Sequence, residues 1–202
     1  FHPVKIITTA EGGMVMTNDP AMAARLERLR SHGITRDPAV MQGEPEGPWV
    51  YEQVELGLNY RLTDLQAALG FSQLSQLETS VARRHAIARR YDAELASLPL
   101  VTPWQSPDAH SALHLYPIQL DAARSQMTRR QLFDGLRAAG VGVNVHYIPV
   151  HTQPHYRRLG FAPGQFPAAE AYYAQAISLP MFPTLTDDQQ STVIAALRQL
   201  VG

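Results

Sequence analysis

The sequence contains no cysteine and only one lysine among its 202 residues. Without cysteine there can be no disulfide, no thiolate nucleophile and no metal site with cysteine ligands, which agrees with a reducing cytoplasm. The formal charge of −1 lacks the basic excess that is typical of nucleic-acid-binding proteins. No apolar run approaches the roughly 20 residues that span a bilayer. We therefore expect a cytoplasmic protein with no nucleic-acid partner, no membrane anchor and no export signal.

The single lysine, Lys5, lies in the segment FHPVKIITTAEGG at residues 1–13, while sixteen other positions carry arginine. A guanidinium stays protonated, whereas a primary amine can lose its proton and attack a carbonyl to form a Schiff base. Ile6 to Thr9 favour a strand, and Gly12 and Gly13 permit a tight reversal into residues 14–17. We therefore predict a hairpin with Lys5 at its entrance. A surface lysine without chemistry is the alternative.

Residues 1–13 also closely resemble the cofactor-lysine segment of the nucleotide-sugar aminotransferases, a branch of the fold-type I enzymes that depend on pyridoxal 5′-phosphate (PLP). The resemblance implies that Lys5 holds PLP as an internal aldimine. It further implies that PLP takes an amino group from glutamate and passes it to a 4-keto sugar on UDP. A dehydratase branch of the family has histidine at this position, so Lys5 favours transamination.

A second informative segment is GLNYRLTDLQAALG at residues 57–70. Thr63 and Gln66 have the spacing of a capping box, so a helix begins there. Its apolar pattern continues to about residue 98, with a break expected near residues 79–80. This segment again resembles the family, which implies that Asn59 reaches across a homodimer to the neighbouring subunit's cofactor and substrate. Alternatively, Asn59 satisfies a turn and Arg61 pairs with a carboxylate.

The other elements are predicted from caps, breakers and periodicity. Asp19 and Pro20 begin a helix that closes at Gly33, and a long surface loop follows at residues 34–55. Pro117 indicates an edge strand within residues 112–120. The remaining predictions are a capped helix from Thr128 to Gly140, a winding loop at 149–167, a helix at 168–175, a strand at 177–181 and a capped final helix after Thr186.

Residues 141–147 alternate in the manner of a strand. The three valines and Tyr147 would share one face, and Gly142, Asn144 and His146 the other. The string NVHYIPVH, which begins at Asn144, is similar to the aminotransferases that make precursors of pseudaminic acid. This resemblance implies that Asn144, Val145, His146 and Tyr147 contact the sugar-nucleotide substrate.

A strand histidine with an ordinary hydrogen bond is the alternative for His146. His146, His151 and His155 could also suggest a metal site. The prolines between them prevent a helix from placing all three on one face, and no cysteine or nearby acid completes a ligand set. We expect no metal.

The resemblance covers nearly the whole chain and implies an α/β fold, the C-terminal part of a fold-type I PLP-dependent transferase. Residues 1–78 would be the remainder of the large PLP-binding domain, and residues 79–202 a small C-terminal α/β domain. The chain begins inside a motif that the family places near the middle, so we expect it to be part of a longer protein. Alternatives are another nucleotide-sugar aminotransferase or, for this chain by itself, a non-catalytic dimerisation module.

Overall fold

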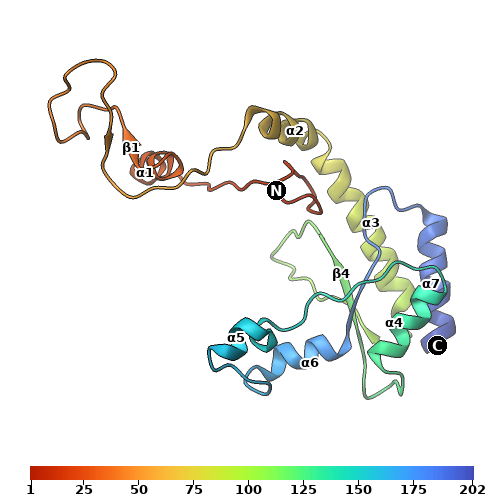
Figure 1. The fold of residues 1–202 in the computed structure, drawn as a ribbon. Coiled ribbons are helices and arrows are strands. Elements are labelled where there is room, and N and C mark those ends of the chain that lie inside the picture. Colours follow the sequence, from red (N-terminus) through yellow and green to blue (C-terminus); the bar gives the residue numbers. More distant parts are fainter. The chain divides into compact units, whose positions relative to one another are not determined.

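The computed structural model describes residues 1–202, which form two compact units at residues 1–75 and 76–202 (Figure 1). The first unit contains helix α1 (Pro20–Arg30), the short strands β1 (Ile34–Thr35) and β2 (Glu52–Gln53), and helix α2 (Asp64–Leu74). The second contains α3 (Leu77–Leu95), β3 (Leu100–Val101), β4 (Tyr116–Leu120), α4 (Arg129–Ala138), the 3-10 turn η1 (Val150–Thr152), α5 (Pro154–Arg158), α6 (Pro167–Gln175), β5 (Ala176–Leu179) and α7 (Asp187–Val201). None of these helices is long and apolar enough to cross a membrane.

Helix α1 begins and ends close to its predicted limits. The Asp19 carboxylate accepts the N–H groups of the first turn, as expected of a residue at this position. At the other end, the Gly33 N–H donates to the Arg28 carbonyl at 2.8 Å. His32, with φ +66, takes the left-handed conformation that terminates the helix. Gly33 therefore ends α1 as predicted, together with His32 in the left-handed conformation.

The predicted hairpin over residues 6–17 is wrong, because no strand forms there. The N–H groups that would pair across a ribbon are bonded elsewhere. The Thr9 N–H donates to the Phe1 carbonyl at 3.0 Å, and the Thr8 N–H donates to the side chain of Gln73 at 2.8 Å. An isolated two-stranded ribbon is marginal in water, so the bonds to Phe1 and Gln73 form in its place.

The long loop is confirmed, and its two ends are joined. β1 and β2 pair antiparallel, with Ile34 opposite Gln53 and Thr35 opposite Glu52. The Glu52 carboxylate also accepts the N–H groups of Gln42 and Gly43. The pairing of β1 with β2 therefore joins the two ends of the loop, and the Glu52 carboxylate holds its middle part close to β2.

The Thr63 capping box forms as predicted. The helix that follows stops earlier than expected, because α2 ends at Leu74 and α3 begins at Leu77. The Ser75 hydroxyl donates to the Ser72 carbonyl at 2.8 Å, and such side-chain bonds compete with regular helix bonding. The predicted apolar face is not buried at its start, since Leu65 is 87% exposed.

The second unit contains an antiparallel sheet in the order β3-β4-β5. The prediction that Pro117 marks an edge strand is wrong, since β4 is the middle strand. Proline is tolerated because β3 pairs with β4 only at Gln119 and Leu120. Pro117 lies opposite Ser178 of β5, and the main-chain groups of Ser178 bond Asn144 on the other side. In an antiparallel ladder the main-chain groups of Pro117 then point away from β5. The lack of an N–H at Pro117 therefore costs no hydrogen bond between β4 and β5.

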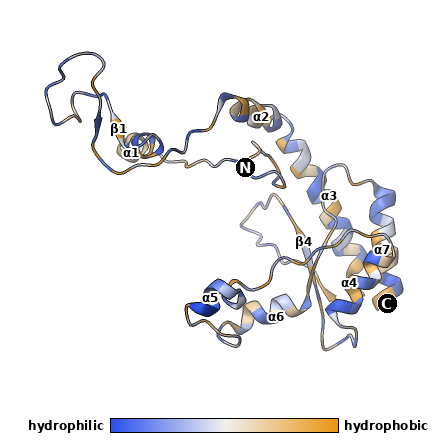
Figure 2. Cartoon of the chain, in the orientation of Figure 1, coloured by the Kyte–Doolittle hydropathy of each residue, from blue (hydrophilic) through white to orange (hydrophobic).

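The hydrophobic core lies entirely in the second unit. Its most deeply buried side chains, at 1% exposure or less, include Tyr91, Ile118, Leu132, Ile177 and Leu197. Helix α4 packs against α7, and hydrophobic and hydrophilic residues alternate along both helices (Figure 2). The first unit, by contrast, buries only Thr9, Gly33 and Thr35.

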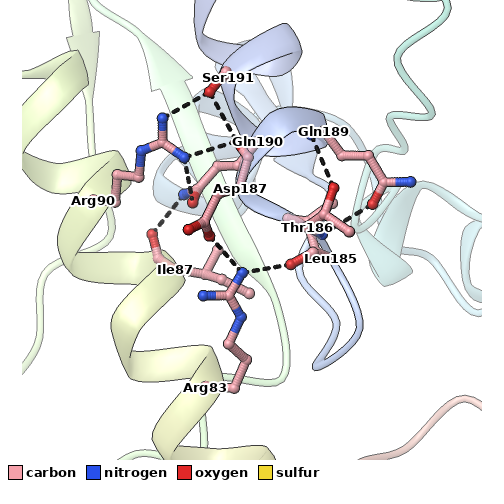
Figure 3. Close-up of polar contacts among 9 residues, drawn as sticks. All are labelled: Arg83, Ile87, Arg90, Leu185, Thr186, Asp187, Gln189, Gln190 and Ser191. Carbon is pink, nitrogen blue, oxygen red and sulfur yellow. Dashed lines mark hydrogen bonds and ion pairs between the residues drawn. The ribbon is translucent and has the colours of Figure 1, made fainter.

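Polar contacts join α3 to the start of α7 (Figure 3). Arg83 donates to the Asp187 carboxylate at 2.8 Å, and buried Gln190 donates to the Ile87 carbonyl at 2.8 Å. The predicted capping box of Thr186 begins α7 beside these contacts. Because Arg83 donates to it, the pKa of the Asp187 carboxyl is lowered.

Candidate active site

Lys5 lies in a turn, where its backbone N–H donates to the His2 carbonyl at 3.0 Å. Its side chain is exposed, and its amine forms no hydrogen bond or ion pair. Local backbone bonds thus fix the position of Lys5 in the turn, while its only reactive group stays free.

Two glutamines of α2 hold the segment that carries Lys5. Gln73 accepts the Thr8 N–H at 2.8 Å, and the Gln66 side-chain amide donates to the Glu11 carbonyl at 3.2 Å. Residues seven apart lie on the same face of a helix, so one face of α2 makes both contacts. From the sequence, Gln66 is predicted only as a capping residue, and Gln73 has no predicted role. Their seven-residue spacing was the available signal.

Gly12 allows this segment to fold closely. A Cβ at this position would lie 2.6 Å from the Thr9 hydroxyl oxygen and 3.0 Å from a methyl group of Leu62, and φ is +151. The Thr9 hydroxyl donates to the Glu11 carbonyl at 2.6 Å. Glycine is therefore needed for this turn to close on Thr9.

Asn59 lies beside the end of α1, where it forms a β-bridge with Ser31. The flanking residues are fixed as well: the Leu58 N–H donates to the Leu29 carbonyl at 2.7 Å. The Asn59 side chain is exposed and makes no hydrogen bond, and Arg61 makes no ion pair. The backbone is thus held while the amide group stays available.

In the second unit, the segment around Asn144 follows β5 through a single bridge rather than as a strand. The Ser178 N–H donates to the Asn144 carbonyl at 2.8 Å, and the Asn144 N–H donates to the Ser178 carbonyl at 3.4 Å. The predicted alternation holds for buried Val141 and Val143. It fails at Tyr147, which is 69% exposed, because no neighbouring strand continues the ladder that far.

His146 is half-buried, and its Nδ1 lies 2.8 Å from the Ser178 hydroxyl oxygen. Its ring also contacts Tyr147 edge to face, with centroids 4.6 Å apart.

On the α4 side, Val145 lines a surface hollow of about 290 Å³ with Arg129 and Phe133. A second hollow lies along residues 53–56, shortly before Asn59 in the sequence.

The other two histidines considered for a metal site have separate environments. His151 is buried, and its Nε2 lies 2.8 Å from the Glu170 carboxylate. This hydrogen bond, together with the Gly164 N–H, lowers the pKa of Glu170. His155 contacts the Tyr156 ring edge to face. The three imidazoles therefore have three different sets of neighbours.

The family model of the DegT/DnrJ/EryC1/StrS aminotransferases matches residues 1–198. The chain belongs to this family. The match extends over both units, so the expected α/β fold of the PLP-dependent transferases is confirmed.

Three relatives of the DegT/DnrJ/EryC1/StrS family illustrate the likeness. The uncharacterized protein MJ1066 of Methanocaldococcus jannaschii is 40% identical over all of this chain and 53% of its own length. The structure of PseC from Helicobacter pylori, described as an aminotransferase of pseudoaminic acid biosynthesis, has a TM-score of 0.84 at 29% identity, covering 99% of this chain and 51% of PseC. The putative sugar aminotransferase Spr1654 of Streptococcus pneumoniae also scores 0.84 at 29% identity in its PMP-form, with 99% and 51% covered. Spr1654 has also been solved in a PLP-form.

The chain spans about half the length of the relatives it matches. Of the predicted site residues, Lys5 and Asn59 belong to the first unit and residues 144–147 to the second.

Proposed function

We propose that this chain is the C-terminal half of a PLP-dependent sugar aminotransferase. The enzyme moves an amino group from glutamate to the keto group of a UDP-linked 4-keto-6-deoxy sugar. The observation that carries the proposal is Lys5, an exposed primary amine without any partner in a segment held by α2. Family membership supports the aminotransferase class, and the likeness to PseC supports a substrate of the pseudaminic acid type.

The residues present fit PLP as the cofactor. A carbonyl cofactor needs an amine that is not paired with a carboxylate, and the amine of Lys5 has no such partner. When bound, PLP supplies an electron sink for the bond that breaks at the amino-bearing carbon. The Lys5 Nζ would hold the cofactor, and the same amine would move the proton at that carbon.

The other predicted residues have binding roles in this proposal. The free amide of Asn59 binds cofactor and substrate of the neighbouring subunit in a homodimer with a shared active site. Asn144, Val145, His146 and Tyr147 bind the sugar nucleotide. Residues 1–78 belong to the large domain and residues 79–202 to the small one.

An absorbance titration of the complete enzyme tests this function. Added PLP should give the band of lysine-bound cofactor, and glutamate should convert that band to the one of the pyridoxamine form. Lys5→Arg keeps the positive charge but should abolish both absorbance changes, because a guanidinium does not form a Schiff base with PLP. A lysine-bound band that survives in Lys5→Arg would contradict the assignment.

A second candidate is a non-catalytic dimerisation module. It is favoured by the exposed apolar side chains of the first unit, among them Leu56, Leu65 and Phe71, which are each at least 80% exposed. Large exposed apolar groups often mark contact surfaces. A chain that dimerises in solution but gives no PLP-dependent absorbance, even as part of the complete protein, would favour this candidate.

A further inference from the structure

Ser178 is a buried polar residue in the middle of β5, with 5% of its surface exposed. Its neighbours in the strand, Ile177 and Leu179, are buried apolar residues. Its main-chain groups are used in the bridge to Asn144. Its hydroxyl has one partner, the Nδ1 of His146 at 2.8 Å. A single serine thus contacts two of the residues that we propose for sugar binding.

The direction of the hydroxyl bond follows from hydrogen-bond accounting. A serine hydroxyl carries one hydrogen, and leaving it buried without an acceptor is unfavourable. No other acceptor contacts the Ser178 hydroxyl. The hydroxyl therefore donates to Nδ1, and a neutral His146 ring carries its proton on Nε2.

We propose that Ser178 is a positioning residue, which orients the His146 ring and fixes its proton on Nε2. The inference deepens the proposed function, on which its relevance to substrate rests. Because Nδ1 is used by a buried partner, Nε2 is the nitrogen left for a ligand. It offers an N–H donor, which suits an acceptor oxygen of the sugar nucleotide, such as a hydroxyl or keto oxygen.

Replacement of the hydroxyl isolates this contact. Ser178→Ala leaves the backbone bridge to Asn144 in place and removes only the bond to His146. Ser178→Thr keeps a hydroxyl and serves as the conservative variant. Ser191→Ala is the matched control, since it also removes a bonded serine hydroxyl of the second unit, on helix α7.

Imidazole nitrogen NMR of the histidine-labelled chain tests the tautomer without any requirement for activity. At a pH where the ring is neutral, wild-type His146 should show an unprotonated Nδ1 and a protonated Nε2, with its signal identified by loss in His146→Gln. Ser178→Ala should give a mixture of tautomers, whereas Ser191→Ala should leave the signal unchanged. A protonated Nδ1 in the wild type, or an unchanged tautomer in Ser178→Ala, would overturn the proposal.

Kinetics of the complete enzyme test the consequence, with a UDP-linked 4-keto-6-deoxy sugar as the probe. Ser178→Ala should raise the KM for this sugar about tenfold with a smaller change in kcat, as expected when the hydrogen bond of a buried polar group is lost. The reaction with glutamate should be unaffected, and Ser178→Thr should recover part of the loss. An equal loss in both half-reactions would indicate a merely structural residue and overturn the proposal. If the wild type does not accept the sugar, the proposed substrate fails, while the NMR result still decides the role of Ser178.

Discussion

The side-chain oxygen of Gln73 accepts the backbone N–H of Thr8 at 2.8 Å, so helix α2 holds the segment that carries Lys5. Gln73→Ala removes this acceptor. We expect the Thr8 amide to exchange with solvent roughly fivefold faster, the equivalent of one net hydrogen bond of about 1 kcal/mol. Hydrogen exchange followed by NMR measures this effect. Gln76→Ala is the control, because Gln76 makes no capping bond, and equal exchange in the two variants would contradict the account.

Adjacent glycines should differ sharply in their tolerance of alanine. Gly12→Ala places a Cβ against the Thr9 hydroxyl in a backbone conformation that side chains disfavour, which costs about 1–3 kcal/mol. At Gly13, a Cβ meets nothing within 4 Å. We expect Gly12→Ala to perturb the amide signals of residues 8–12 and Gly13→Ala to leave them near their wild-type positions. Equal perturbation by both variants would show that the close turn is not formed.

Two leucine substitutions test where the chain derives its stability. Leu132 is fully buried in the second unit, whereas Leu65 is 87% exposed in the first. Leu132→Ala should lower the free energy of unfolding by about 2–5 kcal/mol, and Leu65→Ala by less than about 0.5 kcal/mol. Urea unfolding of the chain, followed by circular dichroism, provides the comparison. A large loss of unfolding free energy in Leu65→Ala would contradict this account, because it would mean that the Leu65 side chain is buried in solution.

The ion pair between Arg83 and Asp187 should make stability depend on pH. Because Arg83 holds the pKa of the Asp187 carboxyl below its usual range, the unfolded chain binds the proton more readily than the folded one. The resulting stabilisation is complete above the unfolded pKa of about 4, and it is lost as the pH falls through the lower folded pKa. Asp187→Asn should therefore be less stable than the wild type at pH 7, with a gap that narrows toward pH 3.

Unfolding by urea at both pH values measures that gap. Asp188→Asn is the control, since it removes a carboxylate from the same first turn of α7 that forms no ion pair. The control should show no comparable narrowing. A gap of the same size at both pH values would contradict the assigned role of Arg83.

Local signals in the sequence predicted the helices well. The capping boxes of Thr63, Thr128 and Thr186 all form, because a cap depends on residues within one turn of the chain. Strand predictions were less accurate. Pro117 lies in a middle strand, where it is tolerated because β3 pairs with only the end of β4 and because Ser178 of β5 bonds Asn144 instead. These pairings involve residues far from Pro117 in sequence, so local sequence signals do not predict them.

The candidate site shows the same division. The residue type of Lys5 predicts a reactive amine, whereas Gln73 and Ser178 are notable for their contacts with residues far from them in sequence. A glutamine on a helix and a serine in a strand carry no motif. They were therefore visible only after the fold had placed them beside the Lys5 segment and His146 respectively.

Covalent trapping of the cofactor on Lys5 tests the central claim most directly. The complete protein is incubated with PLP, reduced with borohydride, digested and analysed by mass spectrometry. The account predicts a pyridoxyl group on the peptide that contains Lys5, and its loss when Lys5 is replaced by arginine. A wild-type protein that is labelled elsewhere, or not at all, would contradict the assignment of Lys5 as the residue that holds PLP.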